Sequence, residues 1–496
     1  MTEWSREERY RRLEDVDQSQ LETLKQQVET SMYRQTFHIQ PETGLLNDPN
    51  GLIYFKGKYY VSHQWFPLGA VHGLKYWFNY TSKDLVTFEP HGVILKPDTL
   101  YDSHGVYSGS AFEWEGQLYY MYTGNHRDES WNRVASQMLA KVEEDGTVKK
   151  LDKPVIAHQP KGYTSHFRDP KVFQKDGQYY AIIGAQNNEE LGRLLLYKAE
   201  NNQLEEWALV GELKTELEAF GFMWECPDYF ELDNKDVILF SPQGIEAQGD
   251  QFRNIYQSGY LIGNLDLETL QFNHGEFIEL DNGFDFYAPQ TFIDEHGKRI
   301  LIGWMGLPEI NYPTDSEGWA HCLTIPRELT IEEGKLHQRP LKALEKLRQN
   351  KETALGYANK FPTTLRPYEG KQYELIIDIL DNEASELYFF ELRTSKLNST
   401  LITYNSKQQT ITLDRSESGL LPDNVEDLTR NTTLDTPLKQ LQIFVDTSSI
   451  EIFCNDGERV LTSRIFPDDI STGIKTSTES GQVYLQFTKY ELKGED

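Results

Sequence analysis

Short runs of apolar and polar residues, separated by turn residues, fill most of the chain from about Phe37 onward. One kind of segment recurs five times: a polar or proline-containing start, an apolar strand, a turn and a second strand. These segments begin at Asn47, Tyr107, Arg168, Glu225 and Tyr287. A period of about 60 residues built from hairpins indicates similar sheets stacked around an axis, because closure of such a ring protects the strand edges. A β-solenoid has shorter repeats, so we predict a five-bladed β-propeller over residues 37–340.

The residues before the repeats are expected to be helical. Apolar residues recur near helical spacing between Trp4 and about Ser31, and Ser5 with Glu8 makes a capping-box pattern. We assign residues 1–36 to a short N-terminal helical segment that packs against the main domain.

After the repeats the pattern changes twice. Residues 341–358 are charged and helix-like, and we assign them to a linker. Residues 359–496 alternate apolar and polar positions between turn residues, which indicates a β-sandwich. Apart from its N-terminal helix the protein is therefore expected to be all-β. The sandwich shows no cluster of catalytic residues, so we expect it to stabilise the propeller and to carry the contact of any oligomer.

Composition excludes several classes of function. The formal net charge of −29 argues against nucleic acids and anionic membranes as partners. Three distant cysteines and twelve scattered histidines show no metal-ligand spacing, and no glycine-rich phosphate loop precedes a helix, so neither metal nor cofactor is expected. No secretory signal or span of about 20 apolar residues is evident, which favours a cytoplasmic protein. A small sugar fits this composition, since the aromatic fraction of 12% can also supply stacking platforms.

Overlaying the repeats brings candidate catalytic residues into register. The first strand of each propeller sheet lines the central channel, so residues at the start of each repeat should converge on the axis. These positions hold Asp48, Ser108, Asp169, the Glu225–Asp228 pair and Tyr287. Each acid alone could cap an ordinary turn. Several acids at matching positions are unlike a purely structural pattern, because like charges on an axis repel one another and are costly to desolvate.

Two facing carboxylates suit glycoside hydrolysis, in which one attacks the anomeric carbon and the other protonates the leaving oxygen. Polar neighbours such as Asn47 and Asn50 should keep Asp48 ionised as the nucleophile. Glu225 follows Phe222, Met223 and Trp224 in the sequence, an apolar setting that should keep it protonated as the acid.

Four motifs carry a resemblance to a known family. Asn47–Gly51 (NDPNG), Tyr107–Ser110 (YSGS), Phe167–Pro170 (FRDP) and Trp224–Asp228 (WECPD) resemble the signatures of glycoside hydrolase family 32, which includes invertases, fructan hydrolases and sucrose-6-phosphate hydrolases. The resemblance extends from about Phe37 to the C-terminus and implies a propeller that carries a β-sandwich.

The same resemblance implies roles for individual residues. Asp48 would be the nucleophile, Glu225 the general acid/base and Asp169 the stabiliser of the transition state, with retention of configuration through a fructosyl-enzyme. The implied substrate-binding residues are Leu46, Asn47, Gln64, Trp77, Tyr107, Ser108 and Arg168. Two departures stand out: Leu45-Leu46 replaces a common Trp-Met pair, and Trp77-Phe78-Asn79 replaces a common Trp-Gly-His stretch.

Within the family the chain looks most like the bacterial sucrose-6-phosphate hydrolases. A phosphorylated sugar needs cations, and Lys75, Arg127 and Arg193 are the candidates that lie in loops after the first strands, with His72 and His126 beside them. We therefore expect a β-fructofuranosidase that acts on sucrose 6-phosphate, on sucrose or on both. A fructan exo-hydrolase, a transfructosylase and a propeller that binds carbohydrate without catalysis are the alternatives.

Overall fold

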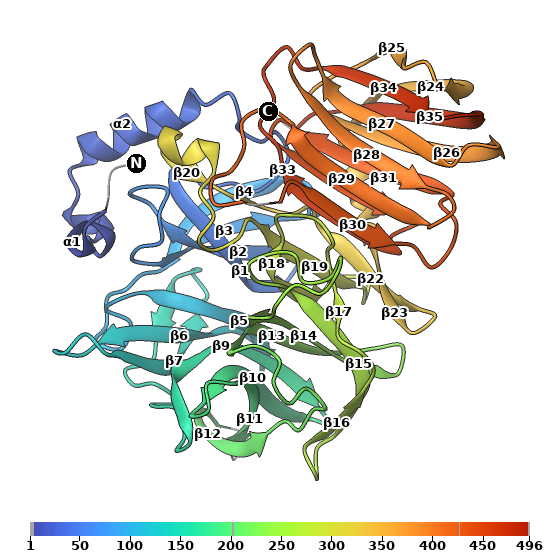
Figure 1. Cartoon of the computed structure of the whole chain (residues 1–496). Helices are drawn as coiled ribbons and strands as arrows, with labels where there is room; N and C mark the ends of the chain where they lie inside the picture. The colour runs from blue at the N-terminus through green and yellow to red at the C-terminus, as the bar shows by residue number, and fades with distance from the viewer. Residues whose placement is uncertain (1–3, 201–202, 426, 495–496) are drawn as a thin grey trace.

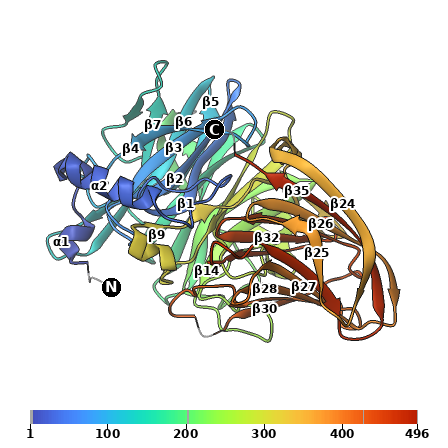
Figure 2. The same ribbon diagram turned by 90° about the horizontal axis from the view of Figure 1, so that it is seen from above.

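The protein folds into a propeller and a β-sandwich that lie side by side, as the computed structural model in Figure 1 shows. The structure describes residues 4–200, 203–425 and 427–494. Residues 1–3 and 495–496 of the predicted terminal segments lie outside the described residues. Figure 2 shows the sandwich against one side of the propeller and the N-terminal helices on another.

Five sheets of four or five strands follow one another along the chain. The first contains β1 (Gly44–Phe55), β2 (Lys58–Phe66), β3 (Tyr76–Ser82) and β4 (Phe88–Leu95), and the second β5 (Val106–Trp114), β6 (Gln117–Arg127), β7 (Arg133–Val142) and β8 (Val148–Lys150). The third contains β9 (Tyr163–Lys175), β10 (Gln178–Asn187), β11 (Gly192–Glu200) and β12 (Gln203–Glu212). The fourth contains β13 (Met223–Leu232), β14 (Lys235–Gln243), β15 (Gly259–Asp266), β16 (Gln271–His274) and β17 (Ile278–Glu279). The fifth contains β18 (Tyr287–Ile293), β19 (Arg299–Met305), β21 (Cys322–Leu323), β22 (Arg327–Glu332) and β23 (Lys335–Pro340).

The first strands of the five sheets form a closed ring. Each of β1, β5, β9, β13 and β18 contacts the next, and β18 contacts β1 again. The short strand β20 (Trp319–Ala320), which follows β19 in the chain, pairs with β1 of the first sheet. This pairing ties the end of the propeller to its beginning and covers one edge of β1. The predicted propeller architecture is confirmed.

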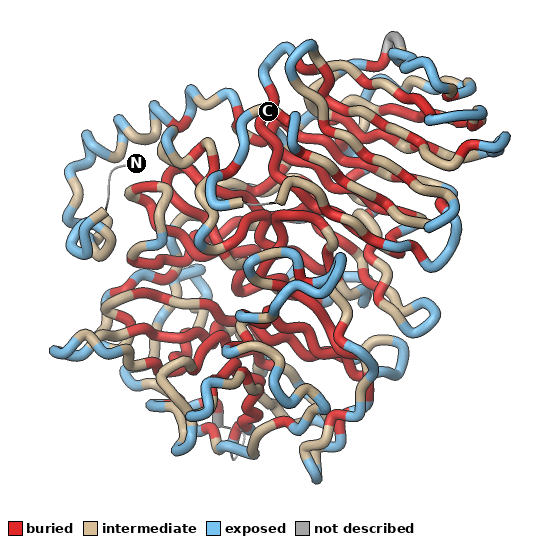
Figure 3. Tube along the Cα trace, in the orientation of Figure 1, coloured by how far each residue is buried: buried red, intermediate tan, exposed pale blue. Residues whose placement is uncertain are grey.

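The sandwich consists of two six-stranded sheets. One contains, in spatial order, β24 (Arg348–Asn359), β35 (Gln482–Leu492), β26 (Tyr373–Glu383), β31 (Gln440–Asp446), β32 (Ser449–Cys454) and β33 (Arg459–Arg464). The other contains β25 (Thr363–Glu369), β34 (Gly473–Thr478), β27 (Leu387–Thr394), β28 (Ser399–Asn405), β29 (Thr410–Glu417) and β30 (Thr429–Thr433). Buried residues concentrate between the two sheets and around the propeller axis (Figure 3).

The prediction of a linker at residues 341–358 is wrong for most of these residues. Lys342–Leu347 forms the 3-10 helix η3, and Arg348 begins β24, which pairs with β35. In this edge strand Leu355 and Tyr357 are exposed, and the small residues Ala354 and Ala358 face inward. The largest side chains therefore point to solvent, which is why the alternation of a strand was not apparent in the sequence.

The N-terminal segment contains two helices instead of one. Ser5 and Glu8 form the predicted capping box of α1 (Arg6–Arg9), a 3-10 turn η1 follows at Leu13–Asp15, and Asp17 caps α2 (Gln18–Glu29). Another 3-10 turn, η2, lies at Pro313–Glu317. No helix among the described residues is long and apolar enough to span a membrane.

A buried ionic network joins the two domains. His38, which precedes β1, hydrogen-bonds through Nδ1 to Asp446 (2.8 Å) and through Nε2 to Glu451 (3.0 Å), both in the sandwich. Arg327 of β22 pairs with Glu451 (2.5 Å) and Asp281 (3.1 Å), and all of these side chains are fully buried or nearly so. Burial lowers the pKa of His38, but its hydrogen bonds to the two carboxylates outweigh burial and raise the pKa to about 9.

This raised pKa predicts a pH-dependent stability. An unfolded histidine has a pKa of about 6.5, so the folded state holds a proton that the unfolded state releases between that pH and about 9. The contribution of His38 should be complete below pH 6.5 and lost as the pH rises through about 9. We expect His38→Gln to lower the free energy of unfolding at pH 6 more than at pH 9.5, measured by urea denaturation. An equal loss at both pH values would contradict a protonated His38.

Candidate active site

A cavity of about 390 Å³ lies where the first strands of the propeller meet. Its walls include side chains from β1, β5, β9, β13 and β18, together with residues of the N-terminal segment. The lining residues are Arg9, Tyr10, Asn47, Asp48, Gln64, His72, Gly73, Lys75, Tyr107, Arg133, Arg168, Asp169, Glu225, Gln243, Tyr287, Trp304, Pro308 and Glu309. The three predicted catalytic carboxylates therefore share one cavity.

Each first strand is bulged at its site residues. In β1 the extra residue relative to the second strand is Asp48. In the other four strands two residues face one on the second strand: Tyr107–Ser108 in β5, Asp169–Pro170 in β9, Cys226–Pro227 in β13 and Ala288–Pro289 in β18. A proline is tolerated there because the ladder of hydrogen bonds is interrupted. Asp169, Cys226 and Ala288, the first bulge residues of their strands, have positive φ angles of 66°, 47° and 48°, a strained conformation for residues other than glycine.

The bulges sort the site residues into two levels along the axis. Asn47, Arg168, Glu225 and Tyr287 directly precede a bulge in their strands. Asp48, Asp169 and Cys226 lie within one. Residues of the same level contact each other: Arg168 and Tyr287 bind Glu225, and the Cys226 thiol lies 3.6 Å from Asp48 and 3.7 Å from Asp169.

Asp48 is held by neutral hydrogen-bond donors. The Ser108 hydroxyl donates to Oδ2 (2.5 Å) and the Asn47 amide to Oδ1 (3.1 Å). Gln64 connects the two donors, because it accepts from Asn47 (2.8 Å) and donates to Ser108 (2.7 Å). The orientation of the carboxylate is thereby fixed from two neighbouring sheets.

Asp169 faces Asp48 across the Cys226 thiol. Its own backbone N–H donates to Thr123 (2.9 Å), and the backbone N–H of Cys226 donates to its Oδ2 (2.9 Å). Both aspartates thus accept hydrogen bonds from neutral donors, and among the residues that the structure describes neither forms an ion pair.

Glu225 has a different environment. The guanidinium of Arg168 donates to its Oε1 through Nε (2.9 Å) and Nη2 (2.7 Å). Gln243 (2.9 Å) and the Tyr287 hydroxyl (2.7 Å) donate to Oε2. Phe222 is 38% exposed, and Met223 and Trp224 are buried away from the cavity, so the apolar setting predicted from the sequence is wrong. Strand alternation and the bulge separate these sequence neighbours from the carboxylate.

These contacts shift the pKa values of the three carboxylates. Burial raises the pKa of Glu225, but Arg168 and the Tyr287 hydrogen bond lower it more, so the net pKa lies below its usual value. Burial, partly offset by the Ser108 hydrogen bond, raises the pKa of Asp48, and burial raises that of Asp169 to about 7 despite Arg168. Among the three neighbouring carboxylates, the pKa is therefore raised at the two aspartates and lowered at Glu225.

The sequence agrees with known proteins along almost all its length. Residues 38–340 match the glycosyl hydrolases family 32 N-terminal domain, and residues 343–493 match the family's C-terminal domain. The chain belongs to glycoside hydrolase family 32. It is 66% identical over 495 residues to a sucrose-6-phosphate hydrolase of Staphylococcus xylosus, covering 100% of both chains, and 41% identical over 442 residues to one of Bacillus subtilis, covering 88% and 89%.

Solved structures of family 32 agree with the fold. The sucrose-6-phosphate hydrolase of Lactobacillus gasseri has a TM-score of 0.92 at 36% identity, covering 99% of this chain and 100% of that one. A β-fructofuranosidase variant of Bombyx mori in complex with sucrose has a TM-score of 0.82 at 30% identity, covering 97% and 99%. This protein is a glycoside hydrolase, as the sequence motifs indicated.

The predicted sugar-binding residues differ in their position relative to the cavity. Asn47, Gln64, Tyr107 and Arg168 line the cavity, and Ser108 binds Asp48 from behind. Leu46 and Trp77 do not reach the cavity. Both are fully buried in apolar clusters, and the Trp77 indole donates to the backbone carbonyl of Tyr107 (3.0 Å), so it supports the wall without lining it.

The three predicted phosphate ligands separate in space. Lys75 lines the cavity but is buried beside Asn47, to which it donates (2.7 Å). Arg193 lies outside the cavity lining, and its guanidinium binds Glu212 (3.3 Å) and the backbone carbonyls of Gly192 and Glu218. Arg127 lies at the end of β6, opposite Arg133 of β7. Asp228, which the overlay of the repeats included, is buried, pairs with Lys171 and accepts from the backbone N–H of Thr291, so its role is structural.

Sequence reasoning missed several lining residues, above all Arg9, Tyr10, Arg133 and Gln243. Gln243 pairs with Met223 in the register of β13 and β14, so its position follows from the hairpin once the bulge is known. Arg9 and Tyr10 reach the cavity through a contact between distant parts of the chain, which no local pattern reveals.

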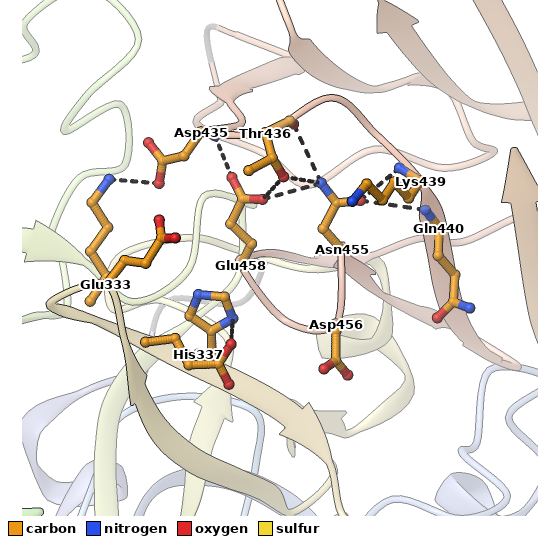
Figure 4. A pocket seen from close by; sticks show the side chains of 11 residues that line it. Glu333, His337, Asp435, Thr436, Lys439, Gln440, Asn455, Asp456 and Glu458 are labelled. Carbon is orange, nitrogen blue, oxygen red and sulfur yellow. Dashed lines mark hydrogen bonds and ion pairs between the residues drawn. The ribbon is translucent and has the colours of Figure 1, made fainter. Parts of the chain in front are cut away.

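A second cavity, of about 760 Å³, lies between the β22–β23 hairpin and the sandwich (Figure 4). Its polar groups largely satisfy one another: Glu458 accepts from Thr436 and Asn455, and Lys335 pairs with Asp435 (2.6 Å). No group of three or more potential metal ligands is found among the residues described by the structure. The site at the propeller axis therefore remains the candidate active site.

Proposed function

We propose that this protein is a retaining β-fructofuranosidase that hydrolyses sucrose 6-phosphate to fructose and glucose 6-phosphate, with sucrose as the related unphosphorylated substrate. The observation that carries the proposal is the convergence of Asp48, Asp169 and Glu225 on one cavity at the propeller axis. Two relatives that cover most or all of this chain are named sucrose-6-phosphate hydrolases, which supports the choice of substrate.

The reaction proceeds by double displacement. The Asp48 carboxylate attacks the anomeric carbon of the fructosyl unit while Glu225 donates a proton to the glycosidic oxygen, so the bond to glucose breaks and a fructosyl-enzyme ester forms. Glu225, now ionised, removes a proton from a water molecule that attacks the same carbon. The ester bond breaks, fructose leaves with retained configuration and Asp48 is ionised again.

Acid catalysis requires a proton on Glu225. Arg168 and Tyr287 hold the pKa of Glu225 below its usual value, whereas the first step needs its acid form. Sugar hydroxyls that donate to Asp48 and Asp169 favour the ionised form of both aspartates. A proton that the aspartates lose becomes available to Glu225, and Asp169 holds the hydroxyls as charge develops on the sugar ring.

The cytoplasmic location expected from the sequence belongs to the same proposal, because a sugar phosphorylated during uptake is encountered inside the cell. Assembly through the sandwich stays a prediction.

Specificity constants test the proposal directly. We expect kcat/KM for sucrose 6-phosphate to exceed that for sucrose by about tenfold or more, since a charge-assisted contact to phosphate adds to the binding of the transition state. Inulin, measured under the same conditions, should be the poorest substrate of the three. Equal constants for sucrose and its 6-phosphate would contradict the choice of substrate, and inulin as the best substrate would indicate a fructan hydrolase.

A further inference from the structure

One wall of the active-site cavity carries arginines that the proposed reaction does not use. Arg9, from the end of α1, and Arg133, from the start of β7, both line the cavity. Arg127 faces Arg133 directly across the β6–β7 pair. Like charges directly opposite on neighbouring strands destabilise a sheet, so two facing arginines at this position call for a compensating anion.

Glu225 acts electrostatically on Arg133 but is already bound by Arg168. Among the described residues, Arg9, Arg127 and Arg133 form no ion pair with a carboxylate, in contrast to Arg168, which binds Glu225. The Nε atoms of Arg127 and Arg133 are buried and have no hydrogen-bond partner. The neighbours of Arg133 are the His166 ring (3.5 Å to Nδ1) and the Tyr107 ring (5.9 Å), neither of which is an anion.

His166 cannot compensate for these charges. Burial and the neighbouring Arg168 and Arg133 lower its pKa to about 4, so it is neutral at pH 7. Burial also lowers the pKa of Arg133, with Arg168 and Arg127 adding to that effect against the opposing influence of Tyr107 and Glu225. Arg9 and Arg127 donate to backbone carbonyls, which do not neutralise their charge. Guanidinium groups held together in a partly buried wall without a carboxylate partner are costly unless a ligand neutralises them.

The N-terminal segment builds the other part of this wall. The Arg9 carbonyl accepts from the backbone N–H of Leu74 (2.7 Å), which fixes the end of α1 on the propeller. Tyr10 packs edge-on against Trp131 (5.4 Å between ring centroids), and the Arg6 guanidinium lies 4.3 Å above the same indole ring. Arg9 is therefore held beside the second sheet of the propeller by contacts on both sides.

We propose that Arg133 and Arg9 bind the phosphate group on the glucose half of the substrate, with Arg127 adding positive charge behind Arg133. This inference rests on the proposed function and refines it, because it assigns the phosphate subsite to β7 and the N-terminal segment. Guanidinium forks match phosphate oxygens in geometry and charge. The carboxylates at the propeller axis hold the fructosyl unit, and the arginine wall holds the far end of the sugar.

The ratio of kcat/KM for sucrose 6-phosphate to that for sucrose tests the subsite. We expect Arg133→Gln to lower this ratio about 10- to 100-fold and Arg9→Gln about tenfold, because each removes a charge-assisted contact made only by the phosphorylated substrate. Arg193→Gln is the matched control, since Arg193 is bound to Glu212 outside the cavity, and it should leave the ratio unchanged. Arg133→Lys should recover part of the ratio, because the charge returns without the planar fork.

Inhibition by inorganic phosphate and by glucose 6-phosphate shows whether the subsite recognises phosphate alone or the whole sugar phosphate. We expect it to inhibit sucrose hydrolysis by the wild type competitively and to inhibit Arg133→Gln more weakly. A stronger effect of glucose 6-phosphate than of inorganic phosphate supports recognition of the whole sugar phosphate. Equal inhibition of wild type and Arg133→Gln by both compounds would overturn the subsite.

Two further outcomes separate the subsite from the proposed function. A wild type that prefers sucrose 6-phosphate, combined with unchanged ratios in Arg133→Gln and Arg9→Gln, rejects the subsite and leaves the function standing. A wild type without that preference rejects the choice of substrate and the subsite with it. Arg9→Gln carries the test if Arg133→Gln does not fold, because Arg9 lies on a half-exposed segment outside the propeller sheets.

Discussion

Asp48→Asn and Glu225→Gln are each expected to lower kcat/KM for sucrose 6-phosphate by about 10⁴-fold or more. An amide at position 48 cannot form the ester with the anomeric carbon, although it can still accept from Ser108. An amide at position 225 cannot supply the proton to the leaving oxygen. Initial rates of glucose 6-phosphate release measure both effects. Glu231→Gln, an exposed acid on the same strand as Glu225, is the control and should retain wild-type activity.

The two variants should fail at different steps. A fructosyl fluoride needs little protonation of its leaving group, so Glu225→Gln should still form the fructosyl-enzyme from it and accumulate that ester, which mass spectrometry detects. Asp48→Asn should form none. Activity of either variant near that of the wild type, or an ester on a residue other than Asp48, would contradict the assigned roles.

The ring of first strands and the convergence of the acids followed from the sequence, because both depend on a repeated local pattern. The overlay matched Asp48 with Asp169, and the structure places both within bulges at the axis. It did not resolve the two levels, since a bulge shifts the register by one residue without changing the apolar pattern. Glu225 consequently aligns with Arg168 and Tyr287, and these two residues bind it.

The environment of Glu225 shows where sequence reasoning fails. Its apolar neighbours along the chain predicted a protonated acid, but the side chains that surround it come from β9, β14 and β18. The same limit applies to Trp77, an aromatic residue that could stack on a sugar but packs behind the cavity wall. It also applies to Arg9, which reaches the cavity through an association between distant segments. Pairing between sheets, and not sequence adjacency, determines these contacts.

Arg327→Met is expected to lower the free energy of unfolding by about 3–5 kcal/mol, since it leaves buried carboxylates without their cation. Arg327 is fully buried and donates to Glu451, Asp281, Gln338 and Thr462. Methionine matches the aliphatic stem of arginine but offers no donor, so the charge on Glu451 and Asp281 stays desolvated. The partners belong to both domains, so the loss should loosen the attachment of the sandwich to the propeller.

The midpoint of urea denaturation measures this effect, and Lys298→Met is the control. Lys298 pairs with Glu328 (2.7 Å) at the surface of the same sheet, and exposed pairs of this kind contribute about 1 kcal/mol or less. Arg327→Met combined with Glu451→Met should regain part of the stability lost in Arg327→Met. The second substitution removes the Glu451 carboxylate, so only Asp281 stays buried without its cation. If Arg327→Met costs no more than Lys298→Met, or the double variant is less stable than Arg327→Met, then the buried network does not hold the domains together by its charges.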